Sequence, residues 1–341
     1  MARVRLQDVA ERAGVSIKTV SNVVNKVGAV TPTTRHKVEE ALQHLQYRPH
    51  VAARHLRQGH SGMIAVALPE LTQPYFAELA SELVRAAKAR TLTVLLNQTD
   101  GLAESEQAIS DGLDMPLMDG LILSPLALRA EDLRNRLDDG PLVLLGEHIG
   151  ESVFPHVTID NKAAAATATR HLIELGRQRI GAIGAQRSGP RETAALRLEG
   201  YRLALGEASI PWRPELVAPV ADFHREDGAA AMHALLDLPE PPDAVFCFND
   251  LLALGALRAL RDRGLTSPHD VAVIGIDDIE EGRFSSPSLS TVAPDKRQIA
   301  ETAIDLLLAH RANPDHAPRT VIADHRLIVR ESTDHTQGRT S

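Results

Sequence analysis

Residues 8–28, DVAERAGVSIKTVSNVVNKVG, decide how the start of this 341-residue chain folds. Apolar residues recur here and just before it at spacings of three and four, which predicts one face of a short helix: Leu6, Val9, Ala10 and Ala13. Gly14 then supplies the backbone freedom that a sharp turn needs. The Ser16 hydroxyl can cap the first amides of a second helix. The stretch is therefore predicted to form two helices joined by a tight turn.

The second helix is predicted to run from about residue 17 to residue 25, with Val20 and Val24 buried. A third helix is expected from Thr31-Pro32, a cap followed by Pro at the first helical position, to about residue 45. Such an arrangement is typical of the helix-turn-helix, whose second helix lies in the DNA major groove. A plain three-helix bundle that meets only water is the alternative. The exposed face of the second helix favours DNA because it is small, polar or basic: Ile17, Lys18, Ser21, Asn22 and Asn25.

Charge is distributed unevenly along the chain, although the whole chain is acidic, with a net charge of −8. Residues 1–60, which we call the head, contain ten Lys or Arg against four Asp or Glu, a net charge of +6. Residues 61–341, the body, therefore carry a net charge of −14. A basic head on an acidic body indicates that one end meets a polyanion while the rest is repelled by it.

Composition excludes several classes of protein. The single cysteine, Cys247, rules out an internal disulfide framework, and its apolar setting AVFCF indicates a buried, inert thiol. No apolar run is long enough to span a bilayer, and the N-terminus lacks an apolar signal-peptide core, so a cytoplasmic location is expected. Metal-ligand spacings, phosphate-binding Gly motifs and a hydrolase elbow are absent from the sequence. We therefore predict no catalytic residue, metal or cofactor, and no enzyme.

The body alternates short apolar runs, such as MIAVALP, GLILSP and VAVIGIDD, with amphipathic helical stretches. Strand–helix alternation of this kind predicts parallel sheets covered by helices on both faces. The strands are too many for one comfortable sheet, so we expect two similar α/β lobes. Ligands of such lobes bind at the carboxyl ends of the strands.

Six residues near strand or helix ends are candidates for a ligand cleft between the lobes. Aromatic rings can stack on a sugar face, and an Arg, Asn and Asp set suits vicinal hydroxyls. Each has a plainer interpretation: the aromatic pair could be lobe core, Asn249-Asp250 a helix cap, and Asp277-Asp278 turn residues. The six candidates are Tyr75, Phe76, Arg197, Phe223, Asn249 and Asp277.

The head resembles the DNA-binding head of the LacI/GalR family of bacterial transcription regulators. The resemblance covers about sixty residues and includes D-V-A-x-x-A-G-V-S, T-V-S-x-V-x-N and Y-x-P-x-x-x-A-x-x-L. It implies a helix-turn-helix domain over residues 1–49 and a hinge helix over residues 50–60 that folds on the operator. In that family a leucine of each hinge wedges into the minor groove. The matching hinge residues here are Ala53, Leu56 and Arg57.

The body motifs A-L-R-L-E-G-Y, F-N-D-L-L-A-L-G and V-I-G-I-D-D resemble effector-pocket motifs of the same family. The resemblance implies a body like a periplasmic sugar-binding protein over residues 61–332, with a disordered tail at residues 333–341. The chain would cross between lobes near Asn161, Ser290 and Ala323. One departure concerns Glu147, because many relatives have an acidic residue one position earlier.

Together these features predict a sequence-specific DNA-binding repressor, a symmetric homodimer on a near-palindromic operator, controlled allosterically by a sugar or glycoside. A sugar-binding receptor without a transcriptional role is the alternative, and it would need an export signal instead of a basic head. Ile17, Lys18 and Asn22 are expected to read bases. Residues expected to position the head on the phosphates are Thr19, Ser21, Asn25 and Thr34. Ser16 is expected among the DNA-binding residues as well.

Overall fold

The computed structural model describes residues 4–24, 27–47, 60–113, 118–147, 153–187, 192–314 and 317–334. The chain forms two compact units that divide between Ser61 and Gly62, one made by the head and one by the body. Among the described residues, no helix has both the length and the apolar character needed to cross a bilayer.

The described part of the head contains three helices, α1 (Leu6–Ala13), α2 (Ile17–Val24) and α3 (Pro32–His44). Gly14 ends α1 in the left-handed conformation with φ 64°, as the predicted turn requires. Ser16 caps α2, because its Oγ accepts from the Thr19 amide at 3.1 Å, and Thr31 caps α3 in the same way. The helices pack through a small core of Val9, Ala10, Val20, Val23, Val38 and Ala41.

One buried position in the head differs from the prediction. Val23 is buried, whereas Val24 is only partly buried. Both lie on the same side of α2 as Val20, at spacings of three and four, so spacing alone does not distinguish them.

The first lobe of the body is built on a six-stranded sheet with the strand order β11-β5-β4-β3-β1-β2, all parallel. Alternate residues of β1 belong to two separate cores, Ile64 and Val66 to one and Ala65 and Ala67 to the other. The strands are β1 (Met63–Leu68), β2 (Thr93–Gln98), β3 (Leu121–Leu123), β4 (Leu142–Leu145), β5 (His156–Ile159) and β11 (Thr320–Ala323). The helices are α5 (Pro74–Ala89), α6 (Ala103–Ser110), α7 (Ala130–Arg134) and α13 (Lys296–Ala312).

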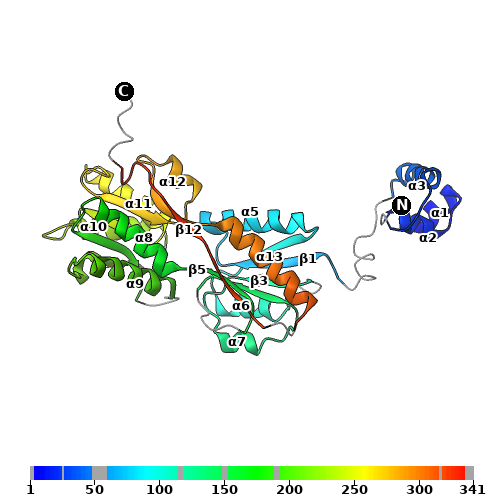
Figure 1. Ribbon diagram of the computed structural model, residues 1–341, viewed down its shortest axis with the longest axis horizontal. Coiled ribbons are helices and arrows are strands. Elements are labelled where there is room, and N and C mark those ends of the chain that lie inside the picture. Colours follow the sequence, from blue (N-terminus) through cyan, green and yellow to red (C-terminus); the bar gives the residue numbers. More distant parts are fainter. Residues whose placement is uncertain are drawn as a thin grey trace, which may run out of the picture. The chain divides into compact units, whose positions relative to one another are not determined.

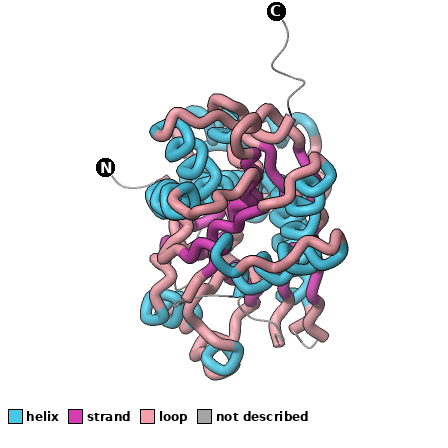
Figure 2. Tube along the Cα trace, turned by 90° about the vertical axis from the view of Figure 1, so that its left-hand side faces the viewer, coloured by secondary structure: helices cyan, strands magenta, loops and turns pink. Residues whose placement is uncertain are grey.

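The second lobe repeats this plan with the strand order β12-β10-β9-β8-β6-β7. Helices flank the strands on both sides, as Figures 1 and 2 show. The strands are β6 (Ile180–Ala185), β7 (Val217–Pro219), β8 (Ala244–Cys247), β9 (Ala272–Ile276), β10 (Ser290–Pro294) and β12 (His325–Ile328). The helices are α8 (Asn161–Glu174), α9 (Glu192–Glu207), α10 (Arg225–Leu236), α11 (Asp250–Asp262) and α12 (Glu280–Phe284), with a short 3-10 turn at Pro214–Leu216.

A single residue carries the chain from one lobe to the other at each of three crossings. Asp160 links β5 to α8, Asp295 links β10 to α13, and Asp324 links β11 to β12. Because β12 enters the second sheet from the side of the first lobe, it runs antiparallel to β10, and the sheet is not wholly parallel. The crossing predicted near Ser290 lies instead at Asp295, because the run from Ser290 to Pro294 forms β10 of the second sheet. The two-lobed α/β prediction is otherwise confirmed.

The chain end is more ordered than the sequence indicates. Thr333, expected in a disordered tail, is fully buried, and its Oγ1 lies 2.8 Å from His171 Nε2 and 2.7 Å from Ser290 Oγ. Residues 335–341 lie outside the described part of the chain.

Candidate functional sites in the head and in the cleft

The outer face of α2 carries the predicted base-reading residues. Ile17, which is 49% exposed, and Lys18 lie on this face, while Asn22 is half-buried. An exposed isoleucine beside a lysine and an asparagine offers an apolar contact, a cation and a bidentate amide to one groove. Among the predicted phosphate contacts, Thr19, Ser21 and Thr34 are half-buried, and Ser16, also predicted to bind DNA, is exposed. Asn25, Ala53, Leu56 and Arg57 lie outside the described residues.

A cavity of about 610 Å³ lies between the two lobes of the body. Both lobes line it near the carboxyl ends of their strands, where parallel sheets bind ligands. All six candidates from the sequence line this one cavity: Tyr75, Phe76, Arg197, Phe223, Asn249 and Asp277. Glu147 lines it as well.

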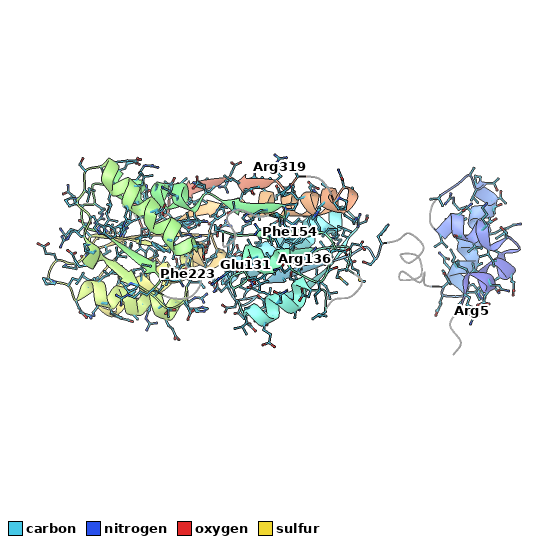
Figure 3. The ribbon with its side chains drawn as sticks, turned by 90° about the horizontal axis from the view of Figure 1, so that it is seen from below. Arg5, Glu131, Arg136, Phe154, Phe223 and Arg319 are labelled. Carbon is cyan, nitrogen blue, oxygen red and sulfur yellow. The ribbon has the colours of Figure 1, made fainter. Side chains whose placement is uncertain are left out.

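The aromatic walls come from opposite lobes. Tyr75 and Phe76 occupy the first turn of α5 and meet edge to face, with ring centroids 5.4 Å apart. Both also pack on the core of the first lobe, so the plainer interpretation as lobe core holds beside the functional one. Phe223 precedes α10 in the second lobe and is labelled in Figure 3.

Arg197 projects from α9 into the floor of the cavity and is 7% exposed. Its Nε donates to Asn161 Oδ1 at 2.7 Å, and its NH1 donates to the carbonyl of Phe248. The side chain is thus fixed by two acceptors of the second lobe, and a fixed guanidinium loses little entropy when it binds a ligand.

Asn249 is both a helix cap and a cavity residue. Its Oδ1 accepts from the Leu252 amide at 2.9 Å, so the predicted alternative, a cap of α11, is present. Its Nδ2 donates to the carbonyl of Phe223 at 3.1 Å. The cap therefore fixes the loop that presents the Phe223 ring.

Asp277 follows β9 and has φ 126°, in the region that favours glycine. Asp250 stabilises the segment that follows Asp277. Its carboxylate accepts from the Ile279 amide at 3.0 Å and from Thr291 Oγ1 at 2.7 Å. The Asp277 carboxylate is 7% exposed, and burial raises its pKa to about 6, against the opposing effects of Arg197 and Lys296.

Direct hydrogen bonds join the lobes across the cleft. Glu147 of the first lobe accepts from Thr158 Oγ1 at 3.1 Å and from Thr193 Oγ1 of the second lobe at 3.0 Å. Sequence reasoning named Glu147 but not Thr193, because nothing in the sequence relates residues that belong to different lobes.

A second bridge forms on the side of α5. Lys296 donates to Glu78 and, at 3.0 Å, to the carbonyl of Asp278, while Glu78 accepts from the Glu280 amide at 2.9 Å. These partners follow β9 directly, so this bridge is connected to the strained Asp277. No sequence motif pointed to Glu78 or Lys296.

A third contact lies at the rim. His224 Nε2 and a Glu70 carboxylate oxygen are 3.6 Å apart, one from each lobe.

Comparisons with known proteins agree with this division into head and body. The model of bacterial regulatory proteins of the lacI family matches residues 5–50, and that of the periplasmic binding protein-like domain matches residues 169–333. The chain is 34% identical over 334 residues, 96% of each chain, to the HTH-type transcriptional repressor CytR of Escherichia coli strain K12.

Two solved structures resemble the chain over nearly its whole length. The transcriptional regulator CelR in complex with cellobiose is 30% identical, with 97% of this chain and 100% of that chain covered and a TM-score of 0.71. The lac repressor dimer bound to operator and the anti-inducer ONPF is 27% identical, with 97% and 99% covered and a TM-score of 0.85. The chain therefore belongs to the LacI family of bacterial regulatory proteins, as a DNA-binding transcriptional regulator and not an enzyme.

Proposed function

We propose that the protein is a repressor that binds its operator as a symmetric homodimer and is controlled by a sugar or glycoside in the cleft. The observation that carries the effector site is the convergence of three aromatic rings with Arg197, Asn249 and Asp277 on one cavity. Rings stack on a sugar face, and fixed donors and acceptors pair with vicinal hydroxyls. The CelR–cellobiose complex supports this ligand class.

Effector binding is expected to act through the contacts that cross the cleft. A ligand that bridges Arg197 and Glu147 favours the closed lobes. The equilibrium between the open and closed forms can shift only as far as the ligand binds one form more tightly than the other. Lobe closure would change the spacing of the two hinge segments, residues 50–60, which carry Ala53, Leu56 and Arg57. These hinge contacts remain a proposal that rests on the family resemblance.

The effector is tested by adding sugars and glycosides to the full chain. Operator affinity is measured by fluorescence anisotropy, and the melting temperature by thermal shift. We expect at least one sugar both to raise the melting temperature and to change operator affinity. Arg197→Ala should abolish both effects while leaving effector-free operator binding intact. If no sugar changed either quantity, the effector part of the proposal would be wrong.

For DNA recognition we propose that Ile17, Lys18 and Asn22 contact bases. Thr19, Ser21, Asn25 and Thr34 contact phosphates, and Ser16 belongs to the same DNA-binding surface. Replacing both Lys18 and Asn22 by Ala should change half-site preference, at about 1–3 kcal/mol for each base that the head no longer reads. Lys37→Ala, an exposed lysine on α3, is the matched control and should weaken all sequences alike. Retention of the original half-site preference by the double variant would contradict the assignment.

The homodimer has a candidate surface on the body. Large apolar residues remain exposed on neighbouring elements of the first lobe, Val84 on α5 and Leu95 and Leu96 on β2, and Phe284 of α12 is 79% exposed. A monomer rarely leaves such residues uncovered together. The lac repressor dimer supports two-fold pairing of this kind.

A further inference from the structure

The cavity between the lobes is strongly acidic. Of the described residues that line it, Arg197 is the one Lys or Arg, and His224 at the rim already faces Glu70. Asp100, Glu192 and Asp222 are exposed to solvent, and Lys296 lies near Asp277. The half-buried Glu147 and the buried Asp277 therefore contribute most to the local potential. An excess of like charge in a cleft with low-dielectric walls disfavours anions there. The acidic lining residues are Glu70, Asp100, Glu147, Glu192, Asp222 and Asp277.

The guanidinium of Arg197 is the one permanently positive group among the described lining residues, and part of its hydrogen-bonding capacity is already used within the protein. Two of its nitrogens already donate within the second lobe, to Asn161 Oδ1 and to the carbonyl of Phe248. A bidentate grip on a phosphate or carboxylate needs two adjacent free N–H groups. One N–H of NH1 and both N–H groups of NH2 have no acceptor among the described residues, so Arg197 can still donate to hydroxyls of a ligand. The exclusion of anions therefore rests on the excess of acidic lining residues.

Asp277 offers its carboxylate to the cavity as an acceptor. Its side chain is 93% buried, it lines the cavity, and no described residue donates a hydrogen bond to its carboxylate. Burying a carboxylate without a donor costs free energy that a bound donor would recover.

Glu147 adds a second acceptor with spare capacity. Its two bonds come from the Thr158 and Thr193 hydroxyls, whereas a carboxylate can accept about four. Glu147 and Asp277 both act on Tyr75, whose pKa is raised by burial and by these two carboxylates. The two acceptors and the Tyr75 ring line the same cavity.

The same ring already tolerates a cation. Lys296 Nζ lies 5.7 Å from the centre of the Tyr75 ring. Aromatic faces attract cations, and carboxylates beside them add a stronger attraction. Carboxylates next to aromatic walls form the lining that a protonated amine prefers.

We propose that the effector is a polyhydroxylated ring that bears an ammonium or other nitrogen donor and no anionic group, with Asp277 and Glu147 accepting from that nitrogen. This inference rests on the proposed effector site and narrows its ligand class. It predicts that phosphorylated sugars and sugar acids are excluded from the cleft.

The test uses the full chain and matched sugars that share one ring configuration and carry different charged groups. Glucose, galactose and mannose are each compared with the 2-amino sugar, the uronic acid and the 6-phosphate, by thermal shift and calorimetry. Within the ring that binds, we expect the amino sugar to bind at least about tenfold more tightly than the two anions. Tighter binding of a uronic acid or a phosphate would overturn the inference and leave the proposed effector site standing. If no compound of any charge bound, the effector site itself would be refuted, and the inference with it.

Two variants assign the selectivity to the named carboxylates. Glu147→Gln and Asp277→Asn should each reduce the ratio of amino-sugar to anion affinity by at least about fivefold. Glu199→Gln is the control, because Glu199 pairs with Lys162 on the surface and does not line the cavity. An unchanged ratio in both cleft variants would overturn the assignment even if the wild-type preference were seen.

Discussion

The carboxylate of Asp277 is 7% exposed, on a residue with φ 126°, and its pKa is raised to about 6 by burial. Nearby Glu78 and Glu147 raise that pKa further, while Arg197 and Lys296 lower it. An unfolded Asp titrates near 3.9, so between about pH 4 and pH 6 the folded chain holds a proton that the unfolded chain has released. Stability from this group is therefore present at low pH and disappears as the pH rises through about 6.

Asp277→Asn should remove this pH dependence. At pH 4 the variant and the wild type should melt at similar temperatures, because both side chains are neutral there. By pH 7 the variant should be the more stable, by at most about 3 kcal/mol. Melting temperatures measured at half-unit steps from pH 4 to 7 give the comparison, and parallel profiles would contradict the assignment.

Sequence reasoning found the cavity residues with distinctive chemistry but not their partners. Arg197, Asn249 and Asp277 stand in recognisable motifs, and all three line the cavity. Thr193 and Glu78 stand in no motif, because their role comes from contacts between lobes that the sequence does not encode locally. The same limit applies within α2, where spacing alone does not decide between Val23 and Val24.

At the scale of elements, helices α10 and α11 approach closely at two glycines. A Cβ on Gly255 would lie 2.0 Å from the carbonyl oxygen of Arg225, and one on Gly228 would lie 2.2 Å from that of Leu252. Phe223 lies just before the start of α10, and Asn249 caps the start of α11. The contact between the two helices therefore helps to position both cavity residues.

Gly255→Ala should destabilise the body by about 1–3 kcal/mol, because backbone atoms must move apart to admit the methyl group. Gly206→Ala is the matched control: it lies within α9 and its Cβ would meet nothing within 4 Å. That change should be neutral or stabilise by up to about 1 kcal/mol. Urea unfolding of both variants gives the two free energies, and equal values would show that the close approach is unimportant.

Ten of the twelve strands in the described part of the chain follow apolar runs that the sequence shows plainly. Strands β11 and β12 are not among the predicted runs. They lie at sheet edges and are partly exposed, and the apolar stretches there are short, VIA and LIV. Only the paired structure shows that β12 runs antiparallel.

At the scale of the whole molecule, head and body form separate compact units. Removing residues 1–60 should therefore abolish operator binding while leaving effector-dependent thermal stabilisation of the body unchanged. Anisotropy and thermal shift on the truncated and full chains give the two readouts. Loss of both activities would argue against separable modules.

The candidate dimer surface predicts a second whole-molecule effect. Leu96→Asp should shift the protein toward monomers in sedimentation and weaken operator binding, because two linked heads bind far more tightly than one. Leu175→Asp is the control, since Leu175 is about as exposed but lies at the end of α8 in the second lobe. A dimeric Leu96→Asp variant would place the interface elsewhere.

The three single-residue crossings determine how the lobes can move. The carbonyl of Asp324 accepts from the Asp295 amide at 2.9 Å, and Ile159, just before Asp160, lies opposite Ala323. The crossings thus lie together at one edge of both sheets and form a short hinge between the lobes. When the lobes rotate about such a hinge, the displacement of a residue grows with its distance from the crossings. Glu70 and His224 follow β1 and β7, toward the opposite edge of the sheets. Opening of the lobes would therefore displace these two residues most, and their contact would break first.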